Sequence, residues 1–195
     1  EKDGAKMVLI PAGSFEMGDH LDGMKRAQPV HKVELDAFYI DIYEVTVGQY
    51  KQFLLETEHQ HPSWNWIKKY SPTDDHPMIN VTWYDAVAYT EWAGKQLPTE
   101  AQWEYGAQGA FPKASAPDSQ RLDRTTMIYA QHDPGLRCNS STMPMAPVHS
   151  PLGVSSFGLH HMAGNVWQWC RDWYEDDFYQ RSQAHELNPV NTRNS

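Results

Sequence analysis

The stretch GLHHMAGNVWQWCRDWY, residues 158–174, gathers many of the side chains in this sequence that could do chemistry. It contains two adjacent histidines, His160 and His161, and one of only two cysteines, Cys170. Adjacent side chains point to opposite faces of a strand and diverge by about 100° on a helix, so the two imidazoles are poorly placed to share one ion. We therefore expect two ordinary packed or surface histidines here rather than a transition-metal site.

The cysteine spacing does not match a redox or zinc motif. Cys138 and Cys170 are separated far more widely than the cysteines of a Cys-x-x-Cys motif or a zinc knuckle. Free cysteine is among the most buried residue types, so two small buried side chains are the favoured interpretation. A disulfide between them is the alternative.

Other catalytic patterns are weak or missing. Glu100 and Glu104 lie one helical turn apart and have the residue types of a general acid/base pair. As solvent-facing residues near a helix N-terminus they are better explained by capping and the helix dipole. The sequence has no glycine-rich phosphate loop after a strand, no Gly-x-Ser-x-Gly elbow and no His-Glu-x-x-His helix. Residues 139–141 form a glycosylation sequon, which matters only in a eukaryotic secretory pathway.

The composition limits the class of protein. Hydrophobic residues make up 40% of the 195 residues and charged residues 21%, which is enough to bury a core in one domain spanning residues 1–195. The net charge of −9 argues against nucleic acid and against an anionic membrane surface as partners. No run of about 18 apolar residues is present to span a bilayer. The sequence begins at Glu1 rather than Met, so a leader segment could have been removed and the compartment stays open. The sequence does not indicate an oligomeric state.

The elements that must position these side chains start with strands. Short runs rich in β-branched and aromatic residues predict strands at residues 6–10, 15–18, 30–36 and 38–45, with the register of the third uncertain. From residue 111 to residue 151 six prolines interrupt any long element. Such a long irregular segment is usually functional or mobile.

Three helices begin with the same local chemistry. Thr46, Thr82 and Thr99 are each followed three residues later by Gln, Asp or Gln, a spacing that predicts a capping box. The apolar side chains behind these caps predict buried stripes, and Gly94 suits a helix end. The predicted stripes are Val47, Tyr50 and Leu54, then Trp83, Val87 and Thr90 with Ala86, then Trp103 and Ala107. Strands followed by helices indicate an α+β fold.

Five phrases, in order, carry a resemblance to a known family. They are MVLIPAGSFEMG (7–18), DAFYIDIYEVT (36–46), residues 77–86, LPTEAQWEY (97–105) and residues 158–174. Together they resemble the formylglycine-generating enzyme family, also called sulfatase-modifying factors. The resemblance implies an α+β fold of C-type-lectin-like type, loop-rich with little regular secondary structure. It implies one such domain over residues 1–195 that lacks the family's C-terminal segment.

The resemblance also implies an activity and an alternative to it. The family's founding activity is oxidation of a cysteine in a Cys-x-Pro-x-Arg segment of a sulfatase to formylglycine, with copper(I), dioxygen and a Cys-x-x-x-x-Cys pair. That pair and the Arg-Gly-Gly-Ser-Trp motif before it are absent from this chain, so copper is expected only if the pair lies beyond Ser195. Similar domains without the pair serve as paralogues or variable ligand-binding scaffolds, for which a protein or peptide ligand is expected. An accessory domain of an iron sulfoxide synthase is a weaker third option.

Site residues follow from the same resemblance. Trp167 matches a tryptophan that lines the family's active site, whereas Trp169, Trp173 and Tyr174 are expected to be core residues of an aromatic strand. The family binds calcium in this loop. Its ligands correspond to Glu44, His161, Gln168 and the carbonyl groups of Gly164 and Val166, with a second site beginning at Asn139. His161 and Gln168 replace Asn and Glu of the family, so one oxygen ligand and one negative charge are lost. A metal-free loop of the same shape is the favoured alternative.

Overall fold

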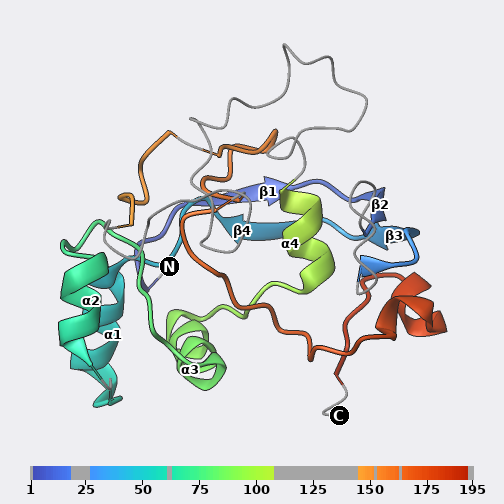
Figure 1. The fold of residues 1–195 in the computed structure, drawn as a ribbon. Helices are drawn as coiled ribbons and strands as arrows, with labels where there is room; N and C mark the ends of the chain where they lie inside the picture. The colour runs from blue at the N-terminus through green and yellow to red at the C-terminus, as the bar shows by residue number, and fades with distance from the viewer. Residues whose placement is uncertain are drawn as a thin grey trace, which may run out of the picture.

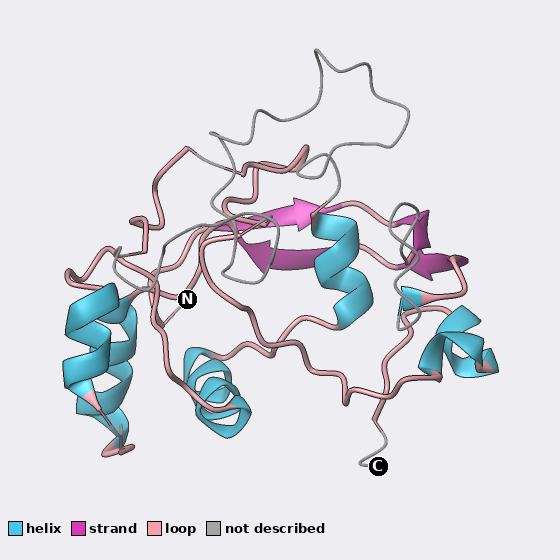
Figure 2. Ribbon diagram, viewed as in Figure 1, coloured by secondary structure: helices cyan, strands magenta, loops and turns pink. Residues whose placement is uncertain are grey.

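Two small antiparallel sheets and four α-helices, joined by long loops, make up the described part of the chain (Figure 1). This computed structural model describes residues 2–18, 27–60, 63–107, 145–151, 153–162 and 164–192. Cys138, Asn139, the sequon at 139–141 and most of the predicted irregular segment 111–151 lie outside the described residues. Figure 2 shows how much of the chain is loop, in agreement with the α+β, loop-rich fold expected from the sequence.

The four predicted strands pair as two hairpin-like sheets. β1 (Met7–Ile10) pairs with β4 (Phe38–Asp41), and β2 (Gly13–Met17) pairs with β3 (His31–Leu35). In β3 the side chains of His31, Val33 and Leu35 are buried while Lys32 and Glu34 face solvent, which sets the register that the sequence left open. β4 is shorter than the predicted 38–45. After Asp41 only Ile42 continues the ladder, by donating to the Lys6 carbonyl at 2.9 Å.

The three predicted capping boxes are confirmed. They precede α1 (Val47–Thr57), α3 (Trp83–Ala93) and α4 (Glu100–Gly106). At each start the threonine hydroxyl accepts from the amide three residues on, and the side chain there accepts from the threonine amide. α3 ends, as expected, at Gly94, which has a left-handed φ of 75°. Both partners of each box lie within one turn, so no tertiary contact is needed to form it.

The helix faces that pack in the core differ from the predicted stripes. α1 buries Phe53 together with Val47 and Tyr50, and Leu54 is only partly buried. α3 buries Tyr89 and Ala93, whereas Trp83, Val87 and Thr90 lie at intermediate depth. The reason is aromatic packing between the two helices: the Tyr89 ring lies 5.8 Å from that of Tyr50 and 5.7 Å from that of Phe53.

A further helix, α2 (Trp64–Tyr70), was not predicted from the sequence. It has seven residues, and its first flanking residue, Ser63, makes no side-chain capping hydrogen bond. Ile67 and Tyr70 are buried and Trp64 is partly buried, so the helix has one short apolar face of two turns. Tertiary packing beside α1, visible on the left of Figure 1, therefore defines this helix more than local sequence does.

The core has two main clusters. The first joins both sheets to α4 and to the 3₁₀ helix η4 (Phe178–Gln180), and the second joins α1, α2 and α3. A second 3₁₀ helix, η5 (Ser182–His185), contacts β3 and η4. A smaller cluster of Ala107, Leu159 and Met162 attaches the segment 153–162 to the end of α4. Gly106 permits this contact, because a Cβ there would lie 2.9 Å from the Leu159 side chain. None of the helices in the described ranges is long and apolar enough for a membrane crossing.

Candidate functional site

The described residues of the segment 158–174, which are all but residue 163, form no strand, so the predicted aromatic core strand is wrong. Gly158, His161 and Asn165 have positive φ angles of 83°, 55° and 70°, which turn the chain repeatedly. Its backbone amides bond to scattered loops rather than to a neighbouring strand. His160 donates to the Ile42 carbonyl at 2.9 Å and Arg171 to the Pro98 carbonyl at 2.8 Å. A period-two pattern of tryptophans does not make a strand where no partner strand runs alongside.

The aromatic side chains of this segment are also more exposed than expected. Trp167 is 75% exposed, Trp169 48% and Tyr174 63%, so the assignment of Trp169 and Tyr174 to the core is wrong. The indole N–H of Trp169 donates to the Val81 carbonyl at 3.1 Å and holds the ring across the surface. Trp173 is half-buried, with its ring 5.7 Å from that of Trp83. A tryptophan at the edge of a core can cover one ring face with protein and leave the other in solvent, while its N–H bonds to a nearby carbonyl.

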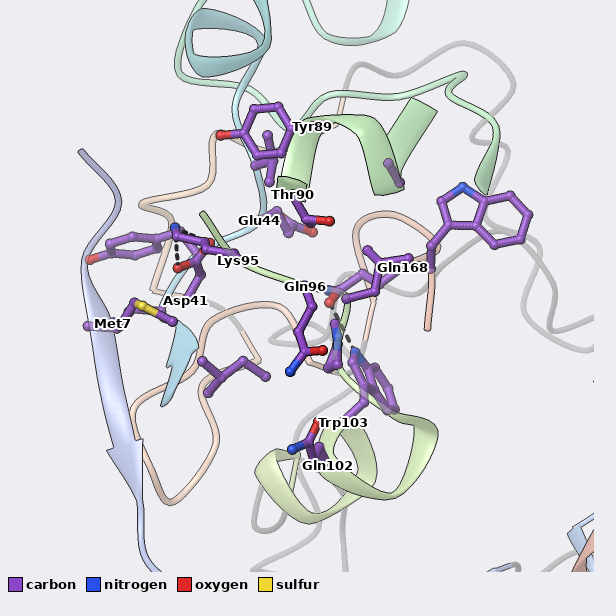
Figure 3. Close-up of a pocket in the computed structure, with 18 of the residues that line it drawn as sticks. Met7, Asp41, Glu44, Tyr89, Thr90, Lys95, Gln96, Gln102, Trp103 and Gln168 are labelled. Atoms are coloured by element: carbon purple, nitrogen blue, oxygen red, sulfur yellow. Dashed lines mark hydrogen bonds and ion pairs between the residues drawn. The ribbon is translucent and has the colours of Figure 1, made fainter. Parts of the chain in front are cut away.

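Two cavities border residues 166–169. The first has a volume of about 470 Å³ and is shown in Figure 3, where Lys95, Gln96, Trp103 and Gln168 surround it. The second, of about 660 Å³, lies between this segment and α2, and its described lining contains no charged side chain. Both are lined by Trp167, Trp169, Met78 and Val81. Trp167 therefore stands at the border between a partly polar and an apolar cavity.

Gln168 is held by a hydrogen bond to helix α4, and the side chains of both partners line the first cavity. Its Oε1 atom accepts a hydrogen bond of 3.0 Å from the indole N–H of Trp103 in α4, as the dashed line in Figure 3 marks. The predicted stripe of α4 thus serves two purposes, since Ala107 is fully buried while Trp103 reaches the cavity. The side-chain oxygen of Gln168 is engaged there and not by the loop at 161–166.

Glu44 and His161, both expected from the resemblance, do come together. His161 Nδ1 lies 2.9 Å from Glu44 Oε2, and their side chains are 0% and 4% exposed. The Nδ2 atom of Asn165 lies 2.9 Å from the same Glu44 oxygen and 3.3 Å from the other. Burial raises the pKa of Glu44, and the donors on His161 and Asn165 partly offset that effect. Asn165 was not singled out from the sequence, although its Gly-Asn context indicated a turn.

Of the remaining expected calcium ligands, Gly164 uses its carbonyl in a hydrogen bond within the loop itself. The Gly164 carbonyl accepts from the Val166 amide at 3.0 Å within a tight turn. His160 points away from His161: the ring centroids are 6.1 Å apart at an interplanar angle of 87°, and His160 Nδ1 lies 2.9 Å from the Ser150 carbonyl. Asn139 is outside the described residues. In the parts of the chain that the structure describes, no group of three or more His, Cys, Asp or Glu side chains could hold a metal ion.

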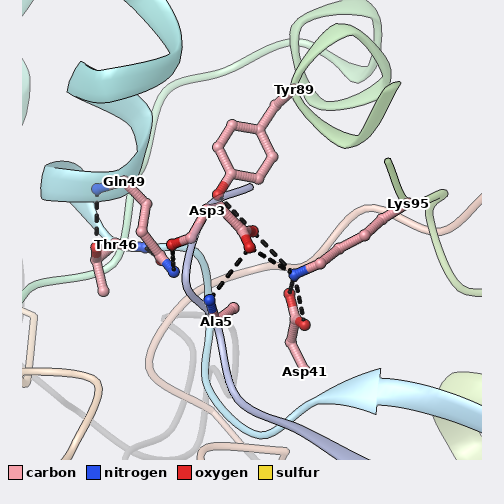
Figure 4. Close-up of polar contacts among 7 residues, drawn as sticks. All are labelled: Asp3, Ala5, Asp41, Thr46, Gln49, Tyr89 and Lys95. Atoms are coloured by element: carbon pink, nitrogen blue, oxygen red, sulfur yellow. Dashed lines mark hydrogen bonds and ion pairs between the residues drawn. The ribbon is translucent and has the colours of Figure 1, made fainter. Parts of the chain in front are cut away.

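A buried charged cluster, which was not predicted from the sequence, lies beside the first cavity. Lys95 Nζ is 2.9 Å from Asp3 Oδ2 and 2.8 Å from Asp41 Oδ1, and the Tyr89 hydroxyl donates to Asp3 at 2.9 Å (Figure 4). The Asp3 side chain is 0% exposed and that of Lys95 9%. The cluster joins the N-terminal residues, β4 and the end of α3. No local spacing could have revealed it, because Asp3 and Lys95 are far apart in the sequence.

Cys170 is a free thiol, but it is half-buried rather than fully buried as the favoured interpretation expected. Burial, and then the carboxylates of Glu100 and Asp172, raise its pKa to about 12. It lines neither of the two cavities described above. The other partner of the alternative disulfide, Cys138, is outside the described residues.

Glu100 is solvent-exposed as expected, whereas Glu104 is half-buried, so the expectation of two solvent-facing residues needs correction for Glu104. Glu104 accepts from the Gly18 amide at 2.9 Å and so connects α4 to the end of β2. The Asp172 carboxylate accepts from the Glu100 amide at 2.7 Å and caps the start of α4. Desolvation by its surroundings, together with Asp172 and Glu104, raises the pKa of Glu100 to about 7. Tertiary neighbours, rather than the helix dipole, dominate here.

Comparison with known proteins finds relatives that match nearly the whole chain. A profile described as the sulfatase-modifying factor enzyme 1-like domain matches residues 1–189. The chain is 32% identical over 200 residues to serine/threonine-protein kinase pkn1 of Chlamydia pneumoniae, covering 94% of the chain and 30% of the kinase. It is 31% identical over 236 residues to the formylglycine-generating enzyme of Thermomonospora curvata, covering 94% of the chain and 77% of that enzyme.

Two further relatives extend the comparison. The chain is 27% identical over 214 residues to inactive C-alpha-formylglycine-generating enzyme 2 of Bos taurus, covering 87% of the chain and 71% of that protein. Among solved structures, PvdO from Pseudomonas aeruginosa superposes with a TM-score of 0.74 at 24% identity, covering 100% of the chain and 80% of PvdO. The PvdO likeness supports the fold. The chain spans less than a third of the chlamydial kinase, where the match is to one part of a longer protein.

Proposed function

Since the chain belongs to the sulfatase-modifying factor enzyme 1-like family, we propose that these 195 residues form a ligand-binding scaffold that presents Trp167 to a peptide or protein segment. The observation that carries the proposal is the position of Trp167. Its side chain is 75% exposed, yet it borders both cavities. Exposed tryptophans beside apolar hollows are typical of sites where a few residues supply most of the binding energy.

The cysteine chemistry supports binding rather than oxidation by these residues. The family's oxidation needs a Cys-x-x-x-x-Cys pair, and the sequence has only Cys138 and Cys170. A thiol with a pKa of about 12 is protonated at neutral pH, and the thiolate is the form that binds metals and attacks. Cys170 therefore has a structural role in this proposal. The name of the bovine relative, an inactive enzyme, is consistent with such a role.

The linings of the two cavities favour a neutral or basic ligand with an apolar side chain. The second cavity has the volume of a typical small-ligand pocket and described walls of Trp66, Tyr70, Met78, Ile79 and other uncharged residues. In the first cavity Lys95 is neutralised by two carboxylates. The net charge of −9 adds a field that attracts basic segments. An apolar side chain in the second cavity and a neutral or basic flank in the first fit this pattern.

A peptide selection tests the proposal. A displayed random peptide library is selected against the wild-type chain, and the recovered peptides are synthesised and titrated by calorimetry. We expect saturable binding that Trp167→Ala weakens at least tenfold, with no change in unfolding temperature. Tyr84→Ala removes an aromatic side chain that is 69% exposed and lines neither cavity, so it should bind like wild type. Equal affinity of the Trp167 and Tyr84 variants would reject the scaffold proposal.

A second candidate, cysteine oxidation, is favoured by the 31% identity to the enzyme of Thermomonospora curvata. In this case the catalytic pair is supplied by protein beyond these residues, and this chain contributes the fold and Trp167. The test incubates a Cys-x-Pro-x-Arg peptide with copper and dioxygen and follows formylglycine by mass spectrometry. Conversion of the peptide by the 195-residue chain alone would contradict the scaffold proposal. Conversion only by a longer gene product would support the second candidate.

A further inference from the structure

Glu44 is a buried carboxylate whose partners are all side-chain donors of one loop. His161 Nδ1 and Asn165 Nδ2 each lie 2.9 Å from Glu44 Oε2, and Asn165 also reaches Oε1 at 3.3 Å. A carboxylate that is only 4% exposed needs such partners, because burying a charge without a partner is strongly unfavourable. Both donors therefore converge on Oε2 of the group that the resemblance assigns to calcium, and Asn165 alone also contacts Oε1.

Asn165 fixes the loop from the other side as well. Its Oδ1 accepts from the Ala146 amide at 2.9 Å, and its Nδ2 lies 3.1 Å from the Ala146 carbonyl. One side chain thus joins Glu44, the loop at 161–166 and the segment at 145–151. Asn165 is buried and adopts a φ of 70°, a conformation that asparagine tolerates better than most residues.

The donor set does not suit calcium. Calcium takes six to eight oxygen ligands, whereas His161 supplies a nitrogen and turns it toward the carboxylate. The second nitrogen of His161, Nε2, is buried and has no hydrogen-bond partner among the described residues. An imidazole contains no oxygen, so His161 cannot replace the oxygen ligand of the family's asparagine. The Gln168 oxygen is bonded to Trp103 and the Gly164 carbonyl to the Val166 amide. Glu44 is left as the only carboxylate of the expected set.

We propose that the Glu44–His161–Asn165 hydrogen-bond network replaces calcium as the element that holds the loop at 161–166 and, through it, Trp167. The imidazole and amide donors take the place of the cation as partners of the Glu44 carboxylate. The loop then folds without any metal. This inference concerns how the loop is held and is independent of which ligand Trp167 contacts.

Thermal unfolding of the 195-residue chain in calcium and in EDTA tests the proposal. A calcium site occupied a hundredfold above its dissociation constant would raise the unfolding temperature of a chain of this size by roughly 5 to 10 °C. We expect wild-type unfolding temperatures to agree within about 1 °C, and elemental analysis of the purified chain to find no stoichiometric calcium. A calcium-dependent rise in the wild type, or bound calcium at one ion per chain, overturns the proposal.

Two variants separate a structural network from a metal site. His161→Ala removes the donor, so it should lower the unfolding temperature by the same amount in EDTA and in calcium. A loss seen only in calcium would overturn the proposal. His160→Ala is the matched control, because His160 Nδ1 faces the Ser150 carbonyl outside the network. It should lower the unfolding temperature less than His161→Ala does. If His161→Ala does not fold, the wild-type unfolding temperatures in calcium and in EDTA, together with the calcium content of the purified chain, still test the proposal.

A restoring variant gives the positive arm. His161→Asn combined with Gln168→Glu supplies the oxygen ligands of the resembling family at both positions. We expect this double variant to gain a calcium-dependent rise in unfolding temperature that the wild type lacks. A double variant that stays indifferent to calcium would show that these two residues are not what excludes the ion, and would overturn the proposal.

Discussion

The indole N–H of Trp103 donates to the side-chain oxygen of Gln168 over 3.0 Å, although the two residues are 65 positions apart. This bond connects α4 to the segment that carries Trp167, and all three side chains line the first cavity. The network of Glu44, His161 and Asn165 holds the same segment from the other end. Two unrelated hydrogen-bond systems thus position one exposed tryptophan.

Gln168→Ala should lower the free energy of unfolding by about 1 kcal/mol, because it leaves the Trp103 N–H without its acceptor. It should also weaken binding of any selected peptide, since Trp167 is then held from one side only. Urea denaturation and calorimetry measure the two effects. Gln183→Ala, at an exposed glutamine of η5, is the control. The same small effect in both variants would mean that the Trp103 contact does not hold the segment.

Lys95→Met should lower the free energy of unfolding by about 3 to 5 kcal/mol at neutral pH, because it leaves the buried Asp3 and the half-buried Asp41 without their cation. Guanidinium denaturation measures the loss. Lys51→Met breaks an exposed ion pair with Asp74 and should cost less than about 1 kcal/mol. Similar losses in the two variants would show that burial of the Lys95 cluster has no special weight.

The same cluster has a defined pH dependence. Burial acts to raise the pKa of Asp3, but Lys95, the Ala5 amide and Tyr89 together outweigh it and hold that pKa below 3.8. Stability from this group is therefore fully present above pH 3.8 and is lost as the pH falls through the lower pKa of the folded state. The difference in free energy of unfolding between wild type and Lys95→Met should shrink as the pH falls below 3.8. Unfolding curves measured from pH 7 to pH 2.5 test this, and a constant difference would contradict it.

Glu100→Gln should stabilise the chain above pH 7 and not below pH 4.5. Desolvation, followed by Asp172 and Glu104, raises the pKa of Glu100 from 4.5 to about 7 in the folded state. A raised pKa means that the folded state binds the proton more tightly, so stability from this group is lost as the pH rises from 4.5 through 7. Unfolding temperatures at pH 4, 6 and 8 check the sign, with Glu91→Gln on the exposed side of α3 as control. A Glu100→Gln chain that gains nothing at pH 8 would contradict the assignment.

Thr82→Ala should lower the unfolding temperature by roughly 2 to 4 °C, the effect of losing about 1 kcal/mol in a chain of this size. The Thr82 hydroxyl caps α3 by accepting from the Asp85 amide at 3.2 Å. Thr82→Ser keeps the hydroxyl and should stay near wild type. Equal melting of the alanine and serine variants would show that the cap adds nothing measurable.

The local parts of the fold were predictable from the sequence. The three capping boxes at Thr46, Thr82 and Thr99 depend on residues three positions apart, and all three form. The strands β1 and β3 follow from short β-branched and alternating runs. The stripe of α3 was misassigned because Tyr89, not Trp83, faces the aromatic rings of α1. α2 was missed because it is only seven residues long, too short for a clear periodic pattern, and Ser63 before it makes no side-chain capping bond.

The sequence by itself determined the family, the α+β class, the helix starts and the absence of a Cys-x-x-x-x-Cys pair from these residues, because each depends on residue identity or on spacing within one turn. Only the tertiary structure decided which tryptophans face solvent and what Glu44 contacts. Glu44 and His161 are 117 positions apart, and their contact exists only once β4, the loop at 161–166 and α4 have packed. Hydrogen bonds of 3 Å require a geometry that no local pattern encodes. Residue types indicated which side chains could belong to the site, and tertiary packing determined which of them contact one another.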